Sequence, residues 1–148
     1  MDLCDILDKV ILFSAAKHQG QRDKAGFPYI LHPIEVMCSV ETIEEKIVAI
    51  THDLIEDTDT TLEDLRVIGV PDYLLKSIDS VTKRYNESYN NFIKRASEDI
   101  IGIKVKLADI KHNTRKDRIE KLDIIVVRNL MNKYYSALDF LEECNDNK

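Results

Sequence analysis

Glycine and proline are scarce in this chain, which has 4 Gly and 3 Pro among 148 residues. Both residue types supply the tight turns that a many-stranded β architecture needs at short intervals. Their scarcity argues against a fold built from many short strands and favours helices.

Cysteine is also rare, and the three that are present, Cys4, Cys38 and Cys144, are scattered and odd in number. The pattern argues against a disulfide framework and lacks the paired spacing of a cysteine metal site. No apolar run approaches the roughly 18 residues needed to span a bilayer. The first residues include three aspartates and lack the basic flank of a signal peptide. We therefore expect reduced thiols, no membrane partner and a cytoplasmic location.

Positive charge is in deficit, because 27 acidic residues outnumber 21 Lys and Arg and leave a formal net charge of −6. A nucleic-acid polymer binds an extended basic surface, so we expect no such partner. A phosphate-bearing small molecule is compatible with this charge, since a metal and a few cations can reverse the sign within one cleft. The chain has no glycine-rich phosphate loop and no nucleotide-binding glycine fingerprint.

The remaining composition is that of a globular domain, with 44% hydrophobic and 32% charged residues. The length suits one hydrophobic core, and the chain shows no internal repeat, low-complexity tract or linker. We predict a single all-α domain over residues 1–148, a compact helical bundle. Its oligomeric state is left open.

Apolar residues recur at the three-to-four-residue spacing of a helix along most of the chain. Thr61 stands three residues before Asp64, which is typical of a capping box at a helix start. Residues 99–113 are rich in β-branched side chains and are the one plausible strand, but their length favours a buried helix. Besides that segment and a polar loop at 19–28, the spacing predicts helices over residues 3–18, 33–38, 44–55, 61–67, 71–81, 89–96 and 121–143.

The dipeptide His52–Asp53 interrupts an otherwise apolar segment. An imidazole and a carboxylate are costly to bury unless they are paired or coordinate something. Glu56 and Asp57 follow one turn later, and Glu56 would share a helix face with both. Clustered acids repel one another, and a bound cation would relieve this repulsion. The alternatives are a hydrogen-bonded pair and an acidic fringe at a helix end, where the helix dipole disfavours acids.

Asp109 is a lone carboxylate in the apolar segment 105–110 and needs a partner there. By itself it could accept one hydrogen bond, whereas with the His-Asp pair it is a natural further ligand. Imidazole and carboxylate ligands together suit Zn, Mn or Fe. Neighbouring cations and an amide are suited to phosphate oxygens, or else form a solvated face: Lys104, Lys106, Lys111, Asn113 and Arg115.

Three segments resemble, in order and spacing, the motifs of the HD-type hydrolase domain of RelA/SpoT proteins. They are residues 20–33 (Gly-Gln-Arg-Asp-Lys-Ala-Gly-Phe-Pro-Tyr-Ile-Leu-His-Pro), 52–58 (His-Asp-Leu-Ile-Glu-Asp-Thr) and 106–113 (Lys-Leu-Ala-Asp-Ile-Lys-His-Asn). Residues 80–84 resemble the Thr-Lys segment between them. The resemblance covers residues 10–116, and no synthetase-like segment is present, as in the stand-alone small hydrolases of the family.

This resemblance implies a divalent metal, usually manganese, held by four side chains: His32, His52, Asp53 and Asp109. It implies that Glu56 and Asp57 act on the water or the leaving group while pyrophosphate is removed from the 3′ position of a guanosine alarmone, guanosine tetra- or pentaphosphate. A metal and a carboxylate are suited to this chemistry, because the metal acidifies water and the carboxylate moves its proton. The substrate contacts that it suggests are Arg22, Lys24, Lys83, Asn113, Arg115 and Tyr134.

Two alternatives stay open. The same site could hydrolyse another phosphorylated nucleotide or dinucleotide, or the chain could be a catalytically silent helical module that binds nucleotides or a protein. Glu56 and Asp57 argue against a silent site, because such a site has no physical reason to keep two mutually repelling acids. The sequence assigns no role to His18 or His112.

Overall fold

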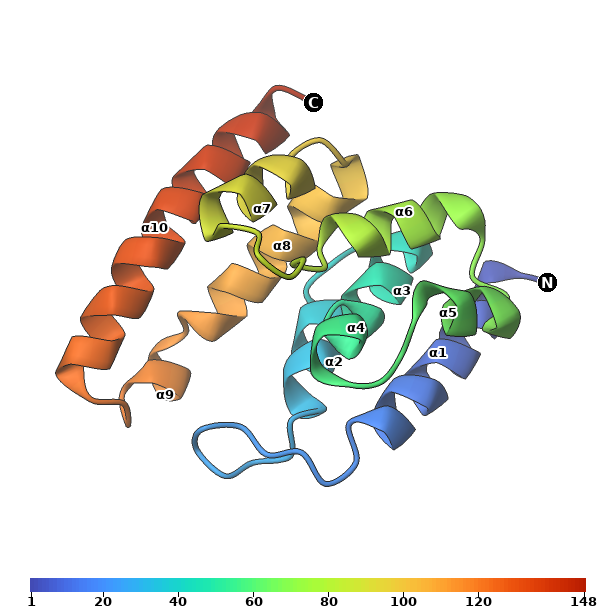
Figure 1. Ribbon diagram of the computed structural model, residues 1–148, viewed down its shortest axis with the longest axis horizontal. Helices are drawn as coiled ribbons and strands as arrows, with labels where there is room; N and C mark the ends of the chain where they lie inside the picture. The colour runs from blue at the N-terminus through green and yellow to red at the C-terminus, as the bar shows by residue number, and fades with distance from the viewer.

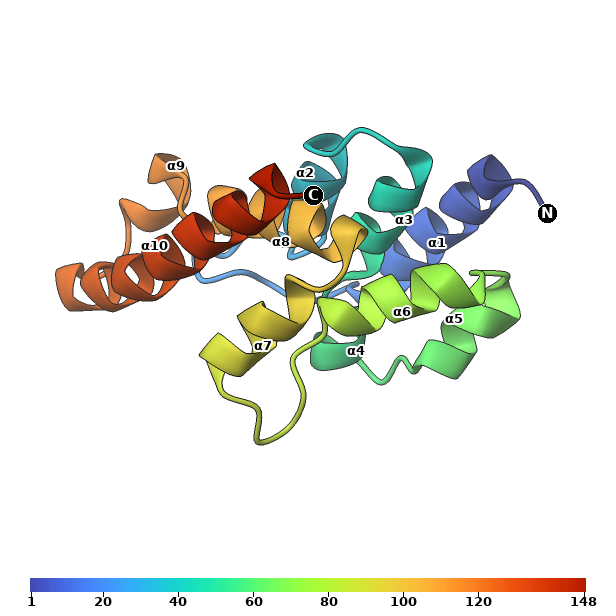
Figure 2. The ribbon, with the colours of Figure 1, turned by 90° about the horizontal axis from the view of Figure 1, so that it is seen from above.

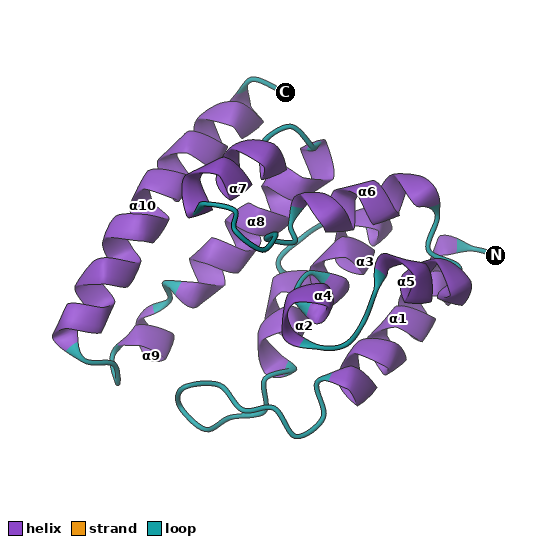
Figure 3. Ribbon diagram, in the orientation of Figure 1, coloured by secondary structure: helices purple, strands orange, loops and turns teal.

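Helices account for all the regular structure of the chain, as the all-α prediction requires (Figure 3). The computed structural model describes residues 1–148 and contains ten helices, no strand and one isolated bridge between Arg22 and Pro28. None of the helices combines the length and the apolar character needed to cross a membrane. The helices are α1 (Leu3–Lys17), α2 (Leu31–Cys38), α3 (Ile43–Thr51), α4 (Leu54–Asp57), α5 (Leu62–Ile68), α6 (Asp72–Ser80), α7 (Tyr89–Ala96), α8 (Ile100–Asn113), α9 (Lys116–Ile119) and α10 (Ile124–Asp146).

Two apolar clusters hold the helices together, and α8 belongs to both. The larger cluster has 17 buried residues, and in it Val105 and Ala108 of α8 join side chains of α1 to α6. The smaller cluster has 6, and in it Ile103 and Leu107 of α8 face α7 and α10. Accordingly, α1 to α6 lie on one side of α8 and α10 forms the opposite edge of the molecule (Figures 1 and 2). The last turns of α8 therefore lie between two packed groups of helices.

The predicted helix over residues 44–55 is wrong at its C-terminal end, because it breaks at His52 and Asp53 into α3 and α4. Its start is well defined, since Thr42 and Glu45 form a capping box. At the other end, the His52 ring takes the Ala49 carbonyl oxygen as acceptor, at 2.6 Å from Nδ1. Side chains that bind backbone carbonyls compete with the helix ladder, which explains the break.

The other predicted helices are present, with shifted ends. Residues 99–113 form α8, so the strand alternative is wrong. The second helix begins at Leu31, two residues before the predicted start at Pro33. The last helix runs over Ile124–Asp146 rather than 121–143. The short helix α9 was not predicted, because it buries no residue and so leaves no apolar period in the sequence.

The loop before α2 is closed by its own polar groups. The Asp23 carboxylate accepts hydrogen bonds from the backbone N–H groups of Ala25 and Phe27, at 2.9 Å each. Gly26 has φ +88°, a conformation that glycine adopts without a steric penalty. This turn brings Arg22 opposite Pro28 and leads directly to Tyr29 and α2.

We predict that Gly102→Ala destabilises the protein. Alanine normally stabilises a helix interior relative to glycine by about 1 kcal/mol. At this position, however, a Cβ would overlap the buried Ser80 Oγ and lie 3.2 Å from the Ala96 carbonyl oxygen. Overpacking of this kind costs about 1–3 kcal/mol, measurable by urea denaturation.

The matched control is Ser80→Ala in the Gly102→Ala background. It removes the overlapping oxygen, whose hydrogen bond is to the Ser77 carbonyl, and should recover part of the lost stability. An unchanged or raised unfolding free energy of Gly102→Ala alone would contradict the close packing of α8 on α6.

Candidate metal centre

Side chains from three parts of the chain form one buried cluster where α2 and the end of α3 pack against α8. His32 lies in the first turn of α2, His52 at the end of α3, and Asp109 in the second half of α8. One potential ligand atom from each lies within 4.8 Å of the other two. His32 Nε2 is 2.9 Å and His52 Nε2 is 3.4 Å from Asp109 Oδ1. The three residues are 1–4% exposed, so this cluster is shielded from bulk water.

Asp53 lies at the edge of this cluster. Its Oδ2 is 3.1 Å from His52 Nε2 and 3.6 Å from His32 Nε2, and it accepts a hydrogen bond from the Tyr29 hydroxyl. Burial raises the pKa of Asp53, but the charge and hydrogen bonding of His52 together with the charge of His32 outweigh burial and lower that pKa to about 2. The structure therefore brings all four predicted metal ligands together, with Asp53 tied to the preceding loop through Tyr29.

The protonation of His52 can be deduced from its contacts. Because the Ala49 carbonyl oxygen is an acceptor, His52 Nδ1 must carry the proton of their hydrogen bond. In the neutral ring Nε2 then carries a lone pair. This nitrogen is buried and has no hydrogen-bond partner, although two carboxylates lie within 3.4 Å of it. A lone pair aimed at carboxylates is repulsive, so a positive charge is needed beside Nε2, either a second proton or a metal ion, and the surrounding donor atoms fit a metal ion.

The electrostatics of the cluster also call for positive charge. Burial alone would lower the pKa of His52, but Asp53 and Asp109 raise that pKa well above its ordinary value. Burial would raise the pKa of Asp109, but Lys106 and His52 hold it well below its usual range. Two imidazole nitrogens and two carboxylate oxygens form a donor set suited to a divalent transition metal.

Asp109 is held in place by two neighbours on its own helix. Lys106 Nζ lies 2.7 Å from Oδ2, and Asn113 donates from Nδ2 to Oδ1 at 3.0 Å. Lys106 is 8% exposed, and Asp109 raises the pKa of Lys106 against the effect of burial. The sequence suggested that Lys106 faces either phosphate groups or solvent. In the structure Lys106 is instead buried and paired with the Asp109 carboxylate.

His32 is held from its other side by His112. The two Nδ1 atoms are 2.6 Å apart, and the rings are stacked with centroids 4.9 Å apart. Burial and the neighbouring His32 lower the pKa of His112 to about 4. His112 is therefore neutral at neutral pH and able to accept a hydrogen bond.

Glu56 and Asp57 lie on α4 at the solvent side of the cluster. Partial desolvation, followed by the charge of Asp53, raises the pKa of both carboxyls above their ordinary values. Glu56 accepts a hydrogen bond from the backbone N–H of Lys83. The Lys83 side chain is exposed and does not line the cavity described below. The segment around Lys83 thus contacts Glu56 through its backbone.

A polar chain missed by the sequence reasoning connects α1 to Asp57. Gln21 Nε2 donates to the Asp57 carbonyl oxygen at 3.0 Å, which leaves Gln21 Oε1 facing His18 Nδ1 at 2.9 Å. The His18 ring also lies 5.2 Å from the Tyr29 ring, centroid to centroid. The three-residue spacing of His18 and Gln21 was the available signal, but nothing in the sequence tied it to α4.

A cavity of about 590 Å³ opens beside the cluster, between the first loop, α8, α9 and α10. Five of the six predicted substrate contacts line it, the exception being Lys83. Tyr29 and His112, which contact Asp53 and His32, also line it, so it borders the residues that hold the buried ligands. Two further cations that line it, Arg118 and Lys121, were not predicted as contacts; Arg118 lies in α9, which was not predicted either. The predicted residues that line it are Arg22, Lys24, Asn113, Arg115 and Tyr134.

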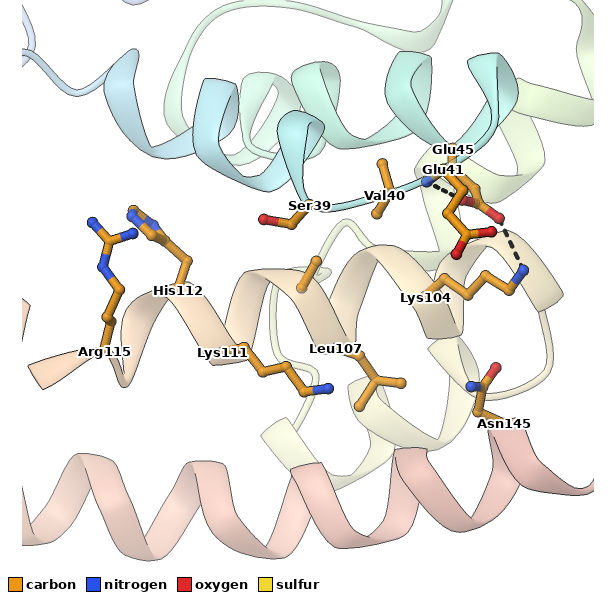
Figure 4. Close-up of a pocket in the computed structure, with 11 residues that line it drawn as sticks. Ser39, Val40, Glu41, Glu45, Lys104, Leu107, Lys111, His112, Arg115 and Asn145 are labelled. Atoms are coloured by element: carbon orange, nitrogen blue, oxygen red, sulfur yellow. Dashed lines mark hydrogen bonds and ion pairs between the residues drawn. The ribbon is translucent and has the colours of Figure 1, made fainter.

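A second cavity of about 490 Å³ runs along the other side of α8 (Figure 4). At one end Lys104 pairs with Glu45 at 3.0 Å, and at the other end lie His112 and Arg115. His112 and Arg115 therefore line both cavities.

Comparisons with known proteins point to one family. The chain matches no protein-family model. It is 36% identical to a GTP pyrophosphokinase of Myxococcus xanthus, over 75% of this chain and 17% of that protein. It is 34% identical to a guanosine-3′,5′-bis(diphosphate) 3′-pyrophosphohydrolase of Aquifex aeolicus, over 70% of this chain and 16% of that protein. The chain thus spans only a small part of the length of these relatives.

The fold is similar to that of a solved structure, described as a metazoan ortholog of SpoT that hydrolyzes ppGpp and plays a role in starvation responses. The TM-score is 0.66 at 22% identity, over 96% of this chain and 92% of that one. Relatives in sequence and the likeness in fold agree with the family that the motifs at residues 20–33, 52–58 and 106–113 resemble. The chain belongs to the RelA/SpoT family of HD-type proteins.

Proposed function

We propose that this protein is a metal-dependent phosphohydrolase that removes pyrophosphate from the 3′ position of guanosine tetra- or pentaphosphate. The observation that carries the proposal is the buried His52 Nε2, which has no hydrogen-bond partner and faces carboxylates. The activity named for the Aquifex aeolicus relative, a guanosine-3′,5′-bis(diphosphate) 3′-pyrophosphohydrolase, supports the choice of substrate. The three free cysteines are compatible with the reducing cytoplasm, which we propose as the compartment.

The metal would be held by His32, His52, Asp53 and Asp109, and we propose Mn²⁺ as its identity. Two nitrogen and two oxygen donors suit manganese among the divalent metals, with zinc and iron as competitors. When bound, the ion supplies a Lewis acid that polarises a phosphoryl oxygen and acidifies water. Tyr29 would orient Asp53, and Lys106 with Asn113 would orient Asp109, so that each carboxylate presents a fixed oxygen.

Glu56 and Asp57 are proposed to move the protons of the reaction. Water attacks phosphorus, the bond between phosphorus and the 3′ oxygen breaks, and the 3′ oxygen takes a proton as it leaves. A carboxyl whose pKa is raised exchanges protons more readily near neutral pH than an ordinary one. Glu56, fixed by the Lys83 N–H, is suited to take the proton from water, and Asp57 to return one to the leaving oxygen.

The cavity beside the metal centre is proposed to hold the nucleotide. Arg22, Lys24, Arg115 and Arg118 give it cations suited to phosphate groups, although Arg118 Nη1 also lies 3.8 Å from Asp23 Oδ2. Tyr134, together with Leu122 and Leu130, adds an apolar side suited to a base or ribose. Lys83, which does not line this cavity, would act on the substrate only through its exposed ammonium.

We expect purified protein supplemented with Mn²⁺ to release pyrophosphate from guanosine tetraphosphate, and Asp53→Asn to release none. The screen also includes simple nucleotides and nicotinamide dinucleotide phosphate. Turnover of another nucleotide alone would keep the metal site and replace the substrate. Silence on every compound would favour the binding module over the enzyme.

We predict that Asp53→Asn weakens Mn²⁺ binding by about 10- to 100-fold or more. That range is typical when a residue that hydrogen-bonds to a metal ligand is replaced, and loss of a ligand itself should cost no less. The substitution keeps the shape of the side chain and removes its charge beside His52. Calorimetric titration with Mn²⁺ measures the effect. The control is Asp59→Asn, the same change at an exposed carboxylate paired with Lys17. Equal affinities of the two variants would remove Asp53 from the ligand set.

Glu56→Gln should retain the metal and lose about two orders of magnitude or more in kcat, because the amide cannot move a proton. Steady-state kinetics and metal content by mass spectrometry give the two readouts. Glu63→Gln, at an exposed surface pair with Arg66, is the control. Loss of metal from Glu56→Gln would instead make Glu56 a ligand.

A further inference from the structure

His112 is a buried histidine in the motif at residues 106–113, but neither the resemblance nor the proposed reaction gives it a role. It lies near the C-terminus of α8 and is 7% exposed. Its ring is stacked on that of His32 with an angle of 20° between the planes, and the two Nδ1 atoms are 2.6 Å apart. At this distance one nitrogen must donate a proton and the other must accept it.

The position of the proton decides whether His32 can bind a metal. His32 Nε2 faces the cluster, at 2.9 Å from Asp109 Oδ1 and 3.6 Å from Asp53 Oδ2. A neutral imidazole binds a metal through a nitrogen that carries a lone pair, so a ligating Nε2 requires the proton on Nδ1. The His32 Nδ1–H then donates to His112 Nδ1, and His112 carries its own proton on Nε2.

The opposite arrangement leaves His32 unable to ligate. If His112 Nδ1 were the donor, His32 Nδ1 would accept and its proton would lie on Nε2, bonded to Asp109. That proton would occupy the place of the ion. The hydrogen bond between the two rings therefore separates a metal-binding tautomer of His32 from a tautomer that closes the site.

We propose that His112 is a positioning residue that accepts the His32 Nδ1 proton and thereby holds His32 in its metal-binding tautomer. The proposal rests on the proposed metal site. His52 has the same support in another form, since its Nδ1–H donates to the Ala49 carbonyl oxygen. One imidazole is thus fixed by a backbone carbonyl, whereas the other is fixed by a side chain that substitution can change. His112 also lines both cavities flanking α8, so this support borders the proposed nucleotide cavity.

The test compares His112→Leu with His112→Asn. Leucine offers no acceptor, whereas the asparagine Oδ1 can stand close to the position of the histidine Nδ1. We expect His112→Leu to bind Mn²⁺ about 10- to 100-fold more weakly than wild type and His112→Asn to recover most of this loss. Competition with a fluorescent chelator measures the affinity without any substrate.

A second measurement reads the tautomer directly in the wild-type protein. Long-range ¹H–¹⁵N correlation spectra of the protein loaded with diamagnetic Zn²⁺ should show the His112 proton on Nε2 and the His32 proton on Nδ1. A His112 proton on Nδ1 overturns the proposal, even if the leucine variant fails to fold. The proposal is also overturned if His112→Leu binds Mn²⁺ as tightly as wild type. The same holds if His112→Asn binds Mn²⁺ as weakly as His112→Leu. Wild type that binds neither ion overturns the metal site itself and the proposal with it.

Discussion

Two imidazoles and two carboxylates meet at the centre of this helical protein, where water cannot screen them. Buried charges of this kind are tolerated only when they are paired or bind an ion. The protein compensates part of the charge itself, since Lys106 pairs with Asp109 at 2.7 Å. The nitrogen of His52 that faces the cluster has no hydrogen-bond partner. The neighbouring structure can be understood as support for these four side chains.

That support comes from helix ends and core packing together. The break between α3 and α4 places His52 and Asp53 outside regular helix, where the His52 ring can reach the Ala49 carbonyl. In addition, α8 contributes side chains to both apolar clusters. This packing fixes the position of α8 along its axis and its rotation about that axis, and therefore the place of Asp109. Rigid packing around a ligand set keeps its geometry before the ion arrives, which favours tight and selective binding.

Local signals in the sequence predicted most of the helices. The Thr61–Asp64 capping box and the apolar spacing of residues 71–81 and 89–96 correspond to α5, α6 and α7. The break at His52 was missed, because apolar spacing continues through it and the competing bond of its ring depends on three-dimensional geometry. For α9 the reason is different: it buries nothing, so no pattern marks it.

The sequence by itself determined the fold class, most of the helical segments and three candidate ligands, because apolar period and the cost of burying His52, Asp53 and Asp109 are properties of local sequence. The fourth, His32, was suggested only by the resemblance of residues 20–33 to a family motif. Only the tertiary structure decided how these residues meet and what holds them. Tyr29, Lys106 and His112 reach the ligands through contacts that span up to 80 residues, such as that between His32 and His112. Such contacts depend on the packing of α2, α3 and α8, and helical spacing along one segment does not encode them.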